Sequence, residues 1–318
     1  MSPDAPADAL WTLALALADA RRAGRLAAGP AGFRLDADGA LRVETGAEGV
    51  RDPRCPIVRR DDGRFAAGPA TEETVATGRS RTLVELCLPL LEARPARPVV
   101  LAHLGQSLDG CIATASGDST TVTGEEDFAH MHRLRALADA VLVGAGTVAA
   151  DDPRLTTRLV AGPSPTRVVL DPRGRLSPTA GVFTDGAAPT LWVRAEREPV
   201  PSSNEPGDGV EVVRVADDAD GGLSLPALLE TLGERGLDAL FIEGGGVTVA
   251  RWLAADRLDR LQIAVAPVIV GDGRRALPLP SAATMNESRR PVTRTYRLGR
   301  DVLWDLDLRA GRADGDRR

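Results

Sequence analysis

The chain has 318 residues, of which 43% are hydrophobic, and a net charge of −6, which is ordinary for a globular protein of one or two domains. It shows neither the clustered basic charge of a nucleic-acid-binding surface nor an apolar run of the roughly 18 residues that span a membrane, so we expect neither partner. Acidic residues precede the first apolar stretch, which argues against a signal peptide and predicts a cytoplasmic protein.

The basic and sulfur-containing side chains narrow the possible chemistry. Lysine is absent and all 39 basic side chains are arginine, which excludes Schiff-base catalysis. A phosphate would therefore be bound by arginine, backbone N–H groups or hydroxyls. Cys55, Cys87 and Cys111 are odd in number and widely spaced, so we predict no disulfide framework and no metal site.

Residues 1–95 differ in pattern from the rest of the chain and predict a small α+β segment. The expected elements are a helix, a hairpin around an Asp-Gly turn and a second helix, over residues 11–22, 33–43 and 81–93. Thr82 and Glu85 form a capping box for the second helix, which Pro89 is expected to kink or end. The composition of residues 93–98 predicts a linker.

From residue 99 onward, short apolar runs alternate with helical patterns, which favours an α/β domain with a largely parallel sheet and an antiparallel edge. The predicted strands are 99–104, 140–144, 167–171, 190–193, 210–215, 239–243, 261–271 and two strands within 295–308 around Gly299. The predicted helices are 125–138, 225–236 and 247–255. Thr123 and Glu126 form a capping box for the first of these helices, and the composition of residues 199–209 predicts a surface loop.

Two glycine clusters come directly after predicted strands. Gly144-Ala145-Gly146-Thr147 exposes backbone N–H groups that can approach a pyrophosphate, although such a turn alone is more often just a tight turn. Residues 243–246, Glu-Gly-Gly-Gly, lie between a strand and a helix, where the glycines can direct N–H groups at an anion. Because α/β sheets bind ligands at the carboxyl ends of their strands, the two clusters together predict a ligand site.

The loop after the first strand of this domain, within residues 103–128, is rich in hydroxyls and glycine and is suited to a polar ligand. We interpret the three histidines as structural or surface residues. His130 and His132 are two positions apart on a predicted helix, so they face different directions and cannot share a metal, and His103 lies on a predicted strand.

Several segments occur in one order with family-like spacing. They are 107–110 (SLDG), 116–119 (SGDS), 122–124 (VTG), 132–148, 151–158 (DDPRLTTR), 167–171 (RVVLD), 242–246 (IEGGG) and 266–271 (APVIVG). Over about residues 97–310 the chain resembles the reductase domain of the bifunctional riboflavin-biosynthesis deaminase/reductase. The resemblance implies a dihydrofolate-reductase-like three-layer fold with a mostly parallel central sheet. It also implies an NADPH-dependent reduction of a pyrimidine ribosylamino phosphate to its ribitylamino form, with the hydride going to the sugar C1.

The resemblance also assigns residues and an assembly state. The implied substrate-binding residues are Ser119, Arg135, Leu155, Arg158 and Glu243. The implied cofactor-binding residues are Gly105, Thr121, Gly144, Gly146, Thr147, Asp151, Gly245 and Gly246. Arg135 and Arg158 have the chemistry to hold a phosphate by bidentate hydrogen bonds. A homodimer is implied as well, and the apolar residues of 261–271 suit a strand with two buried faces.

The chain departs from the family in two regions. The family's zinc deaminase carries histidine and paired cysteines, whereas residues 1–95 contain no histidine, so we predict that this accessory segment is not a deaminase. The reductase domain is then 96–312, followed by a disordered tail, 313–318. Cys111 stands where the family often has a basic residue and Thr121 where it often has tryptophan.

These departures leave alternatives to the pyrimidine substrate open. One is a reductase of the same fold that acts on a pterin or on a carbonyl or imine of specialised metabolism. The other is a non-catalytic ligand-binding member, against which the intact Thr147, Asp151, Arg158 and Glu243 argue.

Overall fold

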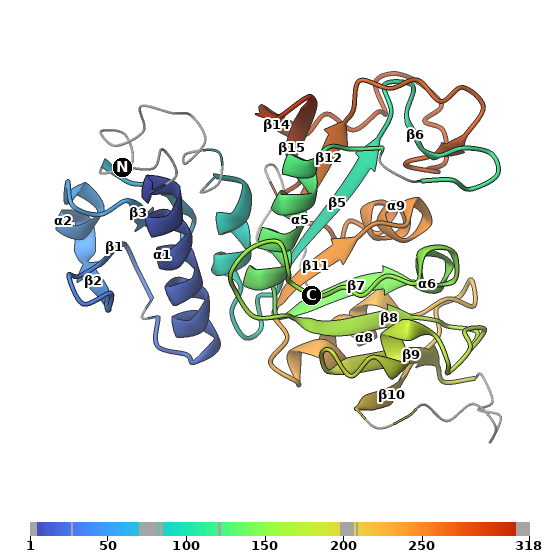
Figure 1. Ribbon diagram of the computed structural model, residues 1–318, viewed down its shortest axis with the longest axis horizontal. Helices are drawn as coiled ribbons and strands as arrows, with labels where there is room; N and C mark the ends of the chain where they lie inside the picture. Colours follow the sequence, from blue (N-terminus) through green and yellow to red (C-terminus); the bar gives the residue numbers. More distant parts are fainter. Residues whose placement is uncertain are drawn as a thin grey trace. The chain divides into compact units, whose positions relative to one another are not determined.

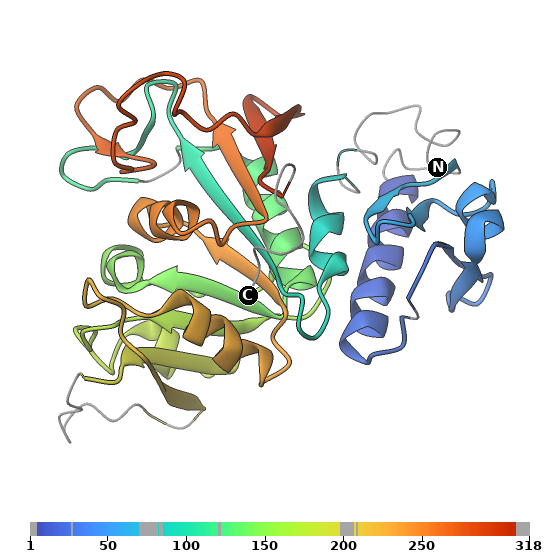
Figure 2. The same ribbon diagram turned by 180° about the vertical axis from the view of Figure 1, so that it is seen from behind.

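The computed structural model describes residues 5–26, 28–69, 82, 85–119, 122–197, 207 and 209–309. The chain divides into two compact units, Met1–Val99 and Val100–Arg318, each of which is described by itself. Figure 1 and Figure 2 show both units from opposite sides. The predicted tail, 313–318, lies outside the described residues.

The first unit contains the predicted helix and hairpin. Helix α1, Ala5–Arg22, precedes a sheet of order β2-β1-β3-β4. The bounds are β1 (Ala31–Leu35), β2 (Leu41–Thr45), α2 (Gly46–Arg51), β3 (Ile57–Arg59) and β4 (Phe65–Ala67). The expected second helix is largely a 3₁₀ helix in its described part, η1 (Leu88–Glu92), with Pro89 in its first turn, where a missing N–H breaks no internal bond.

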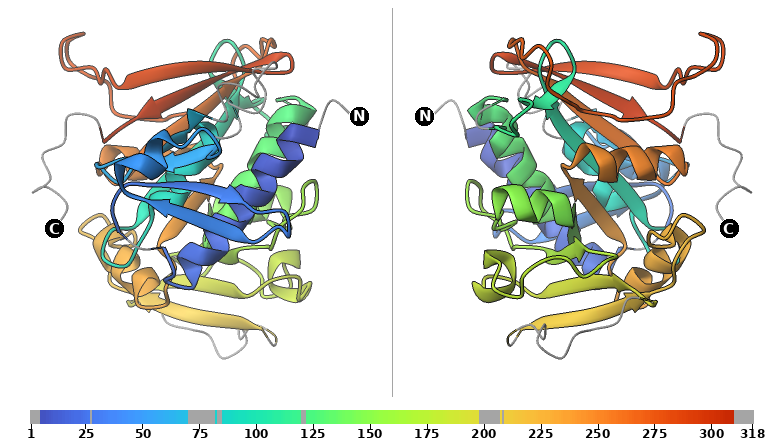
Figure 3. Two further views of the ribbon diagram at one scale, coloured as in Figure 1. Left: turned by 90° about the vertical axis from the view of Figure 1, so that its left-hand side faces the viewer. Right: turned by 90° about the vertical axis from the view of Figure 1, so that its right-hand side faces the viewer.

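Within the described residues, the second unit is built on a nine-stranded sheet of order β10-β9-β8-β7-β11-β5-β12-β15-β14. The bounds are β5 (Val99–Gln106), β7 (Ala140–Gly144), β8 (Thr166–Leu170), β9 (Thr190–Ala195), β10 (Val210–Val215), β11 (Ala239–Glu243), β12 (Arg260–Val265), β14 (Val292–Leu298) and β15 (Asp301–Asp307). Neighbouring strands are parallel from β10 through β9, β8 and β7 to β11, and β5 is parallel to β12. Strand β15 is antiparallel to both β12 and β14. The predicted α/β class with an antiparallel edge is therefore confirmed. Figure 3 shows β14 and β15 as a long antiparallel ribbon at one border of the sheet.

Helices cover both faces of this sheet. Helices α8 (Leu225–Gly233) and α9 (Gly246–Ala254) pack on one face through an apolar core that includes Leu228, Trp252 and Leu142. Helix α5 (Glu125–Leu137) lies on the other face and is joined to it by polar contacts, such as His130 Nε2 with Gln262 Oε1 at 2.7 Å. Figure 1 shows α5 in front of the sheet, and Figure 2 shows α8 in front of it. This is a three-layer arrangement.

Among the differences from the expected elements, two have a clear physical reason. The capping box at Thr123 and Glu126 is wrong, because the N-cap of α5 is Gly124, whose N–H donates to the buried carboxylate of Asp301 at 2.6 Å. The strand expected over 261–271 ends at Val265, because Pro267 has no N–H to donate to a neighbouring strand.

Four short elements of the second unit were not anticipated. They are β6 (Cys111–Ala113), α6 (Ala145–Asp151), α7 (Gly181–Thr184) and β13 (Arg274–Arg275). Strands β6 and β13 pair antiparallel with a register shift between Arg274 and Arg275. This small ribbon brings the loop after β5 beside the segment after β12.

Candidate functional site

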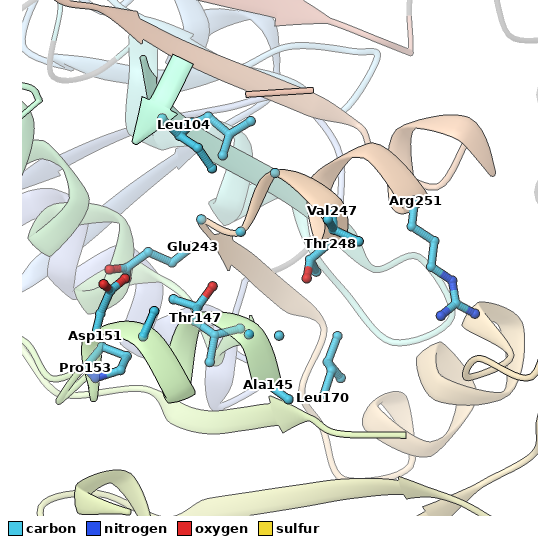
Figure 4. Close-up of a pocket in the computed structure, with 18 of the residues that line it drawn as sticks. Leu104, Ala145, Thr147, Asp151, Pro153, Leu170, Glu243, Val247, Thr248 and Arg251 are labelled. Atoms are coloured by element: carbon cyan, nitrogen blue, oxygen red, sulfur yellow. The ribbon is translucent and has the colours of Figure 1, made fainter. Parts of the chain in front are cut away.

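A cavity of about 790 Å³ lies where β5, β7, β8 and β11 end. Its walls are formed by the segments that come after these strands, the position at which ligands bind in open α/β sheets. In Figure 4, Glu243 and Asp151 occupy one end of the cavity and Arg251 the other, with Thr147 and Thr248 between them.

Glycines form the wall between the two ends because larger residues do not fit there. A Cβ at Gly246 would lie 2.3 Å from the carbonyl oxygen of Ala276. Gly245 adopts a φ of +75°, and a Cβ there would lie 2.8 Å from the hydroxyl of Thr147. Gly146, by contrast, has open space where its Cβ would be. Gly245 and Gly246 are therefore required for the close packing of this turn against its neighbours, and both glycine clusters line the cavity.

Helix α9 begins directly at this wall. Its N-cap is Gly245, which has no side chain to bond the first N–H groups of the helix, and Thr248 lies in the first turn beside the cavity. The first N–H groups of a helix lack partners within the helix and carry its positive end. The wall is consequently suited to the phosphate groups of a nucleotide.

The loop from Asp151 to Arg158 is held in an unusual conformation. Asp152 and Leu155 adopt φ angles of +38° and +56°, which are uncommon for residues other than glycine. Asp152 accepts a hydrogen bond from the N–H of Gly181 at 2.8 Å, and the side chain of Leu155 is buried at the cavity. Such conformations concentrate at functional sites, where the surrounding structure maintains them.

Glu243 is held in place by Arg135. The guanidinium Nε donates to Oε2 of Glu243 at 2.6 Å, and a second nitrogen contacts Oε1, so that the pair is bidentate. A further Arg135 nitrogen donates to the carbonyl oxygen of Thr156 at 2.7 Å, which links the pair to the 151–158 loop. Arg135 is 5% exposed, so its donors serve the protein, and it orients Glu243 at the cavity.

Arg158 has a different environment. Its N–H donates to Nδ1 of the buried His132 at 2.9 Å, while its exposed guanidinium makes two long contacts of 3.4 Å with Thr156. Burial, followed by the charges of Arg135 and Arg154, lowers the pKa of Arg158. The loop thus carries positive charge with no close carboxylate among the described residues, which is favourable for an anion.

His132 fixes this loop as a neutral imidazole. Burial and the positive charges of Arg135 and Arg158 lower the pKa of His132 to about 4. The neutral ring leaves Nδ1 as an acceptor for the N–H of Arg158. The interpretation of His132 as a structural residue agrees with this arrangement.

The loop after β5 is anchored by Asp109. Its carboxylate accepts hydrogen bonds from Ser107, from the N–H of Val270 at 3.2 Å and from the N–H of Gly271 at 2.7 Å. These bonds lower the pKa of Asp109 to about 2. The neighbouring Cys111 is buried, with Sγ 3.6 Å from the carbonyl oxygen of Gly271, and it does not line the cavity. Cys111 therefore packs within the loop.

Most of the residues implied by the resemblance come together at the cavity. The lining includes Ser119, Leu155 and Glu243 from the expected substrate set, and Gly105, Gly144, Gly146, Thr147, Asp151, Gly245 and Gly246 from the expected cofactor set. Arg135 and Arg158 lie beside the cavity without lining it, and Thr121 lies outside the described residues.

Sequence reasoning missed several residues that line the cavity. They are His103, Met131, Arg175, Thr248, Arg251, Arg274 and Arg275. Arg175 lies after the turn that ends β8, where Asp171 accepts its N–H at 3.1 Å. The Arg251 side chain contacts the carboxylate of Asp218 and the carbonyl oxygen of Leu223. The sequence offered one weak signal for these arginines as ligand-site residues. They lie either after a strand or within a helix that follows a glycine cluster.

In the described part of the chain, no group of three or more His, Cys, Asp or Glu side chains is arranged to hold a metal ion. No helix in that part combines the length and hydropathy of a membrane-spanning segment. The absence of a metal stays a prediction.

The second unit matches a known family model, the RibD C-terminal domain, over residues 98–303. The chain belongs to this family. It is 39% identical over 220 residues to the 2,5-diamino-6-ribosylamino-4(3H)-pyrimidinone 5′-phosphate reductase of Methanothermobacter thermautotrophicus, a match that covers 67% of this chain and 99% of that protein. The chain is therefore an oxidoreductase of a riboflavin-biosynthesis family, as the resemblance implied.

Three further comparisons define the extent of the likeness. The chain is 36% identical over 180 residues to the riboflavin biosynthesis protein RibD of Bacillus amyloliquefaciens, covering 56% of this chain and 48% of that protein. A solved deaminase/reductase from Thermotoga maritima superposes with a TM-score of 0.54 at 28% identity, over 75% of this chain and 62% of that one. A riboflavin biosynthesis reductase from Saccharomyces cerevisiae shares the fold, with a TM-score of 0.56 at 20% identity, over 71% and 97% of the two chains. The reductase fold expected from the sequence is thus confirmed.

Proposed function

We propose that this chain reduces 2,5-diamino-6-ribosylamino-4(3H)-pyrimidinone 5′-phosphate to its ribitylamino form with NADPH. The observation that carries the proposal is the cavity at the ends of β5, β7 and β11, in which a glycine wall faces a polar end containing Glu243, Asp151 and Ser119. The 39% identity to a reductase of that name, over 99% of its length, supports the diamino form of the substrate.

A second pyrimidine is the main rival. The Thermotoga maritima protein is described as acting on 5-amino-6-(5-phosphoribosylamino)uracil, which carries an oxygen where the diamino compound carries an amine. We favour the diamino compound because residues 1–95 contain no histidine, so the chain lacks the histidine of a zinc deaminase that would produce the uracil form.

The residues present fit a nicotinamide dinucleotide. We assign its pyrophosphate to the glycine wall, where Gly144, Gly245 and Gly246 allow the backbone close approach and α9 begins. Thr147 and Thr248 supply hydroxyl donors beside it. The bound cofactor supplies a hydride, and the protein contributes mainly binding and orientation. The identity of the arginine near a 2′-phosphate stays open.

On the substrate side, we assign Glu243 and Asp151 to hydroxyl groups of the sugar, although the resemblance implied a cofactor contact for Asp151. Both carboxylates present acceptors at the same end of the cavity, and Arg135 fixes the orientation of Glu243. Ser119, whose hydroxyl lies 3.5 Å from Asp151, adds a donor there. Arg158 is assigned to the 5′-phosphate, since the positive charge of its guanidinium has no close carboxylate.

We also propose a homodimer, on the resemblance alone. The outer edge of β14 is unpaired among the described strands, and Val292 and Trp304 on the β14–β15 ribbon are exposed. A monomer mass by light scattering at micromolar concentration would contradict this assembly. The cytoplasmic location stays a prediction.

The function is tested by following NADPH oxidation with each of the two pyrimidine phosphates and with a pterin. We expect turnover with the diamino compound, slower turnover with the uracil compound and none with the pterin. Calorimetric titration of NADPH and NADH is run alongside, with tighter binding expected for NADPH. No binding of either dinucleotide would refute the enzymatic interpretation as a whole.

A further inference from the structure

His103 is a buried histidine of β5 that lines the cavity and has no role in the assignments above. It is 1% exposed, and its Nε2 lies 2.8 Å from Oδ1 of Asp127 on α5. Its Nδ1 has no hydrogen-bond partner among the described residues. Its carbonyl oxygen accepts the N–H of Gly244 at 3.3 Å, which fixes His103 beside the turn that carries Glu243.

An unpartnered ring nitrogen in such a place requires an explanation. Buried polar atoms of native proteins are nearly always hydrogen-bonded, and the exceptions concentrate at catalytic sites. The other ring nitrogen, Nε2, contacts Asp127, which lies 24 residues further along the chain on α5. The ring is therefore oriented by tertiary packing. The unpartnered nitrogen is therefore held in a defined orientation, on a residue that lines the cavity.

The charges around His103 favour its protonated form. Asp127 and His130 approach from α5, with the two histidine rings 5.8 Å apart between centroids, and Glu243 acts from β11. The residue in register on β12 is the neutral Gln262. Burial alone would lower the pKa of His103, but the charge and hydrogen bond of Asp127, aided by Glu243, raise it above its usual 6.5. This shift favours the form of the ring that carries protons on both nitrogens.

The proposed reaction, on which this inference rests, needs one proton as well as one hydride. When the sugar ring opens, the nitrogen lone pair forms a C=N bond to C1′, the C1′–O4′ bond breaks and its electron pair moves to O4′, which takes up a proton. Addition of a hydride to C1′, which a bound nicotinamide would supply, then returns the C=N electron pair to nitrogen. The balance is one hydride to carbon and one proton to oxygen.

We propose that His103 donates this proton from Nδ1–H to the ring oxygen of the substrate and that Asp127 positions it. The carboxylates at the same end are poor donors, since Glu243 is committed to its ion pair with Arg135. An aspartate that holds an imidazole in one orientation and stabilises its charged form is a recurring arrangement in general acid–base catalysis. After turnover, His103 is reprotonated from solvent.

The test compares His103→Gln and Asp127→Asn with His130→Gln, a matched buried histidine of α5 that does not line the cavity. Turnover of 2,5-diamino-6-ribosylamino-4(3H)-pyrimidinone 5′-phosphate with NADPH is measured from about pH 5.5 to about pH 9, a range that brackets the ordinary histidine pKa. The dissociation constant of NADPH is measured by calorimetry for each variant, and the ring-nitrogen chemical shifts of His103 are recorded by NMR in the ligand-free wild type and in Asp127→Asn.

We expect His103→Gln to lower kcat by about 10²- to 10⁴-fold, the usual range for loss of a general acid, while the affinity for NADPH is retained. In wild-type protein, kcat should fall as the pH rises through the His103 pKa, since the acid form is required. Asp127→Asn should shift this alkaline limb to lower pH, because burial then lowers the pKa of His103 without the opposing effect of the Asp127 carboxylate. The His130→Gln control should keep both kcat and the limb.

Two results would overturn the assignment. One is a His103→Gln enzyme with wild-type kcat, and the other is an alkaline limb that Asp127→Asn leaves in place. If His103→Gln does not fold, the limb in Asp127→Asn and the NMR shifts decide, because a His103 that is neutral at pH 7 in wild-type protein has no proton to donate. If the wild-type chain leaves the pyrimidine unreduced, the proposed function itself is overturned. If the wild type and His103→Gln are both active, only the assignment of His103 is overturned.

Discussion

The sharpest prediction about the substrate side concerns Arg158. Its guanidinium makes only two contacts of 3.4 Å with Thr156, so little is lost inside the protein when it is removed. The loop itself is held through the N–H of Arg158, which donates to His132 at 2.9 Å and is retained in alanine. The Arg158→Ala variant should therefore fold and keep the conformation of the loop.

The expected magnitude can be worked out from the bond that Arg158 would make to a phosphate. A hydrogen bond to a charged group contributes about 1.5–3 kcal/mol, which corresponds to a rise in KM of roughly 10- to 150-fold. The affinity for NADPH should change little, since the glycine wall lies outside this loop. Arg154→Ala is the matched control, because Arg154 is an exposed arginine of the same loop to which the resemblance assigns no ligand.

The assay is steady-state kinetics with the diamino pyrimidine phosphate, paired with calorimetric titration of NADPH on the same preparations. An alternative interpretation is that Arg158 only secures the loop by pairing with Asp151 or Asp152, although the ion pairs of the described residues include no such pair. In that case KM and the dissociation constant of NADPH would rise together in Arg158→Ala. A matched loss of this kind would refute the assignment of Arg158 to the phosphate.

Further predictions concern stability and the glycine wall. Removing Arg135 by Arg135→Ala leaves the Glu243 carboxylate partly buried without its partner, so chemical denaturation should show a loss of about 3–5 kcal/mol in the free energy of unfolding. Gly246→Ala should abolish NADPH binding in calorimetry, because its Cβ would meet a backbone oxygen at 2.3 Å, whereas Gly146→Ala should leave the free energy of unfolding nearly unchanged. Since the folded-state pKa of His132 is about 4 and its ordinary value is 6.5, the unfolded chain binds the extra proton between these values. The free energy of unfolding should thus fall as the pH drops from about 6.5 to about 4, and less steeply in His132→Gln, when unfolding is measured by denaturant at each pH.

The strands of the sheet could be predicted from the sequence because they are buried on both faces. Runs such as 140–144 and 239–243 are almost entirely apolar, and their limits as strands match the expectation. Short elements gave no comparable signal. Helix α6 begins after Gly144 without a capping side chain, and β13 has only two residues, so local patterns did not separate them from turns.

The polar contacts beneath the cavity could not be predicted for a different reason. Arg135 and Glu243 are 108 residues apart, and His130 and Gln262 are 132 apart, so no local spacing connects them. His103 has only apolar residues and glycine beside it in its own strand until Gln106, a context that suggests a structural histidine. Its significance depends on Asp127 of α5 and on the cavity, both of which exist only in the folded chain.

The choice between a sugar phosphate and a pterin can be argued from the same contacts. A pterin is flat, and its recognition requires mainly an apolar slot and one carboxylate that pairs with the ring nitrogens. A phosphoribosyl group requires several acceptors for hydroxyls and a separate cation for the phosphate. The polar end of this cavity contains Glu243, Asp151 and Ser119, and the adjacent loop carries the unneutralised charge of Arg158. The cavity end therefore combines several acceptors with a nearby cation, a set that suits a sugar phosphate better than a single planar ring.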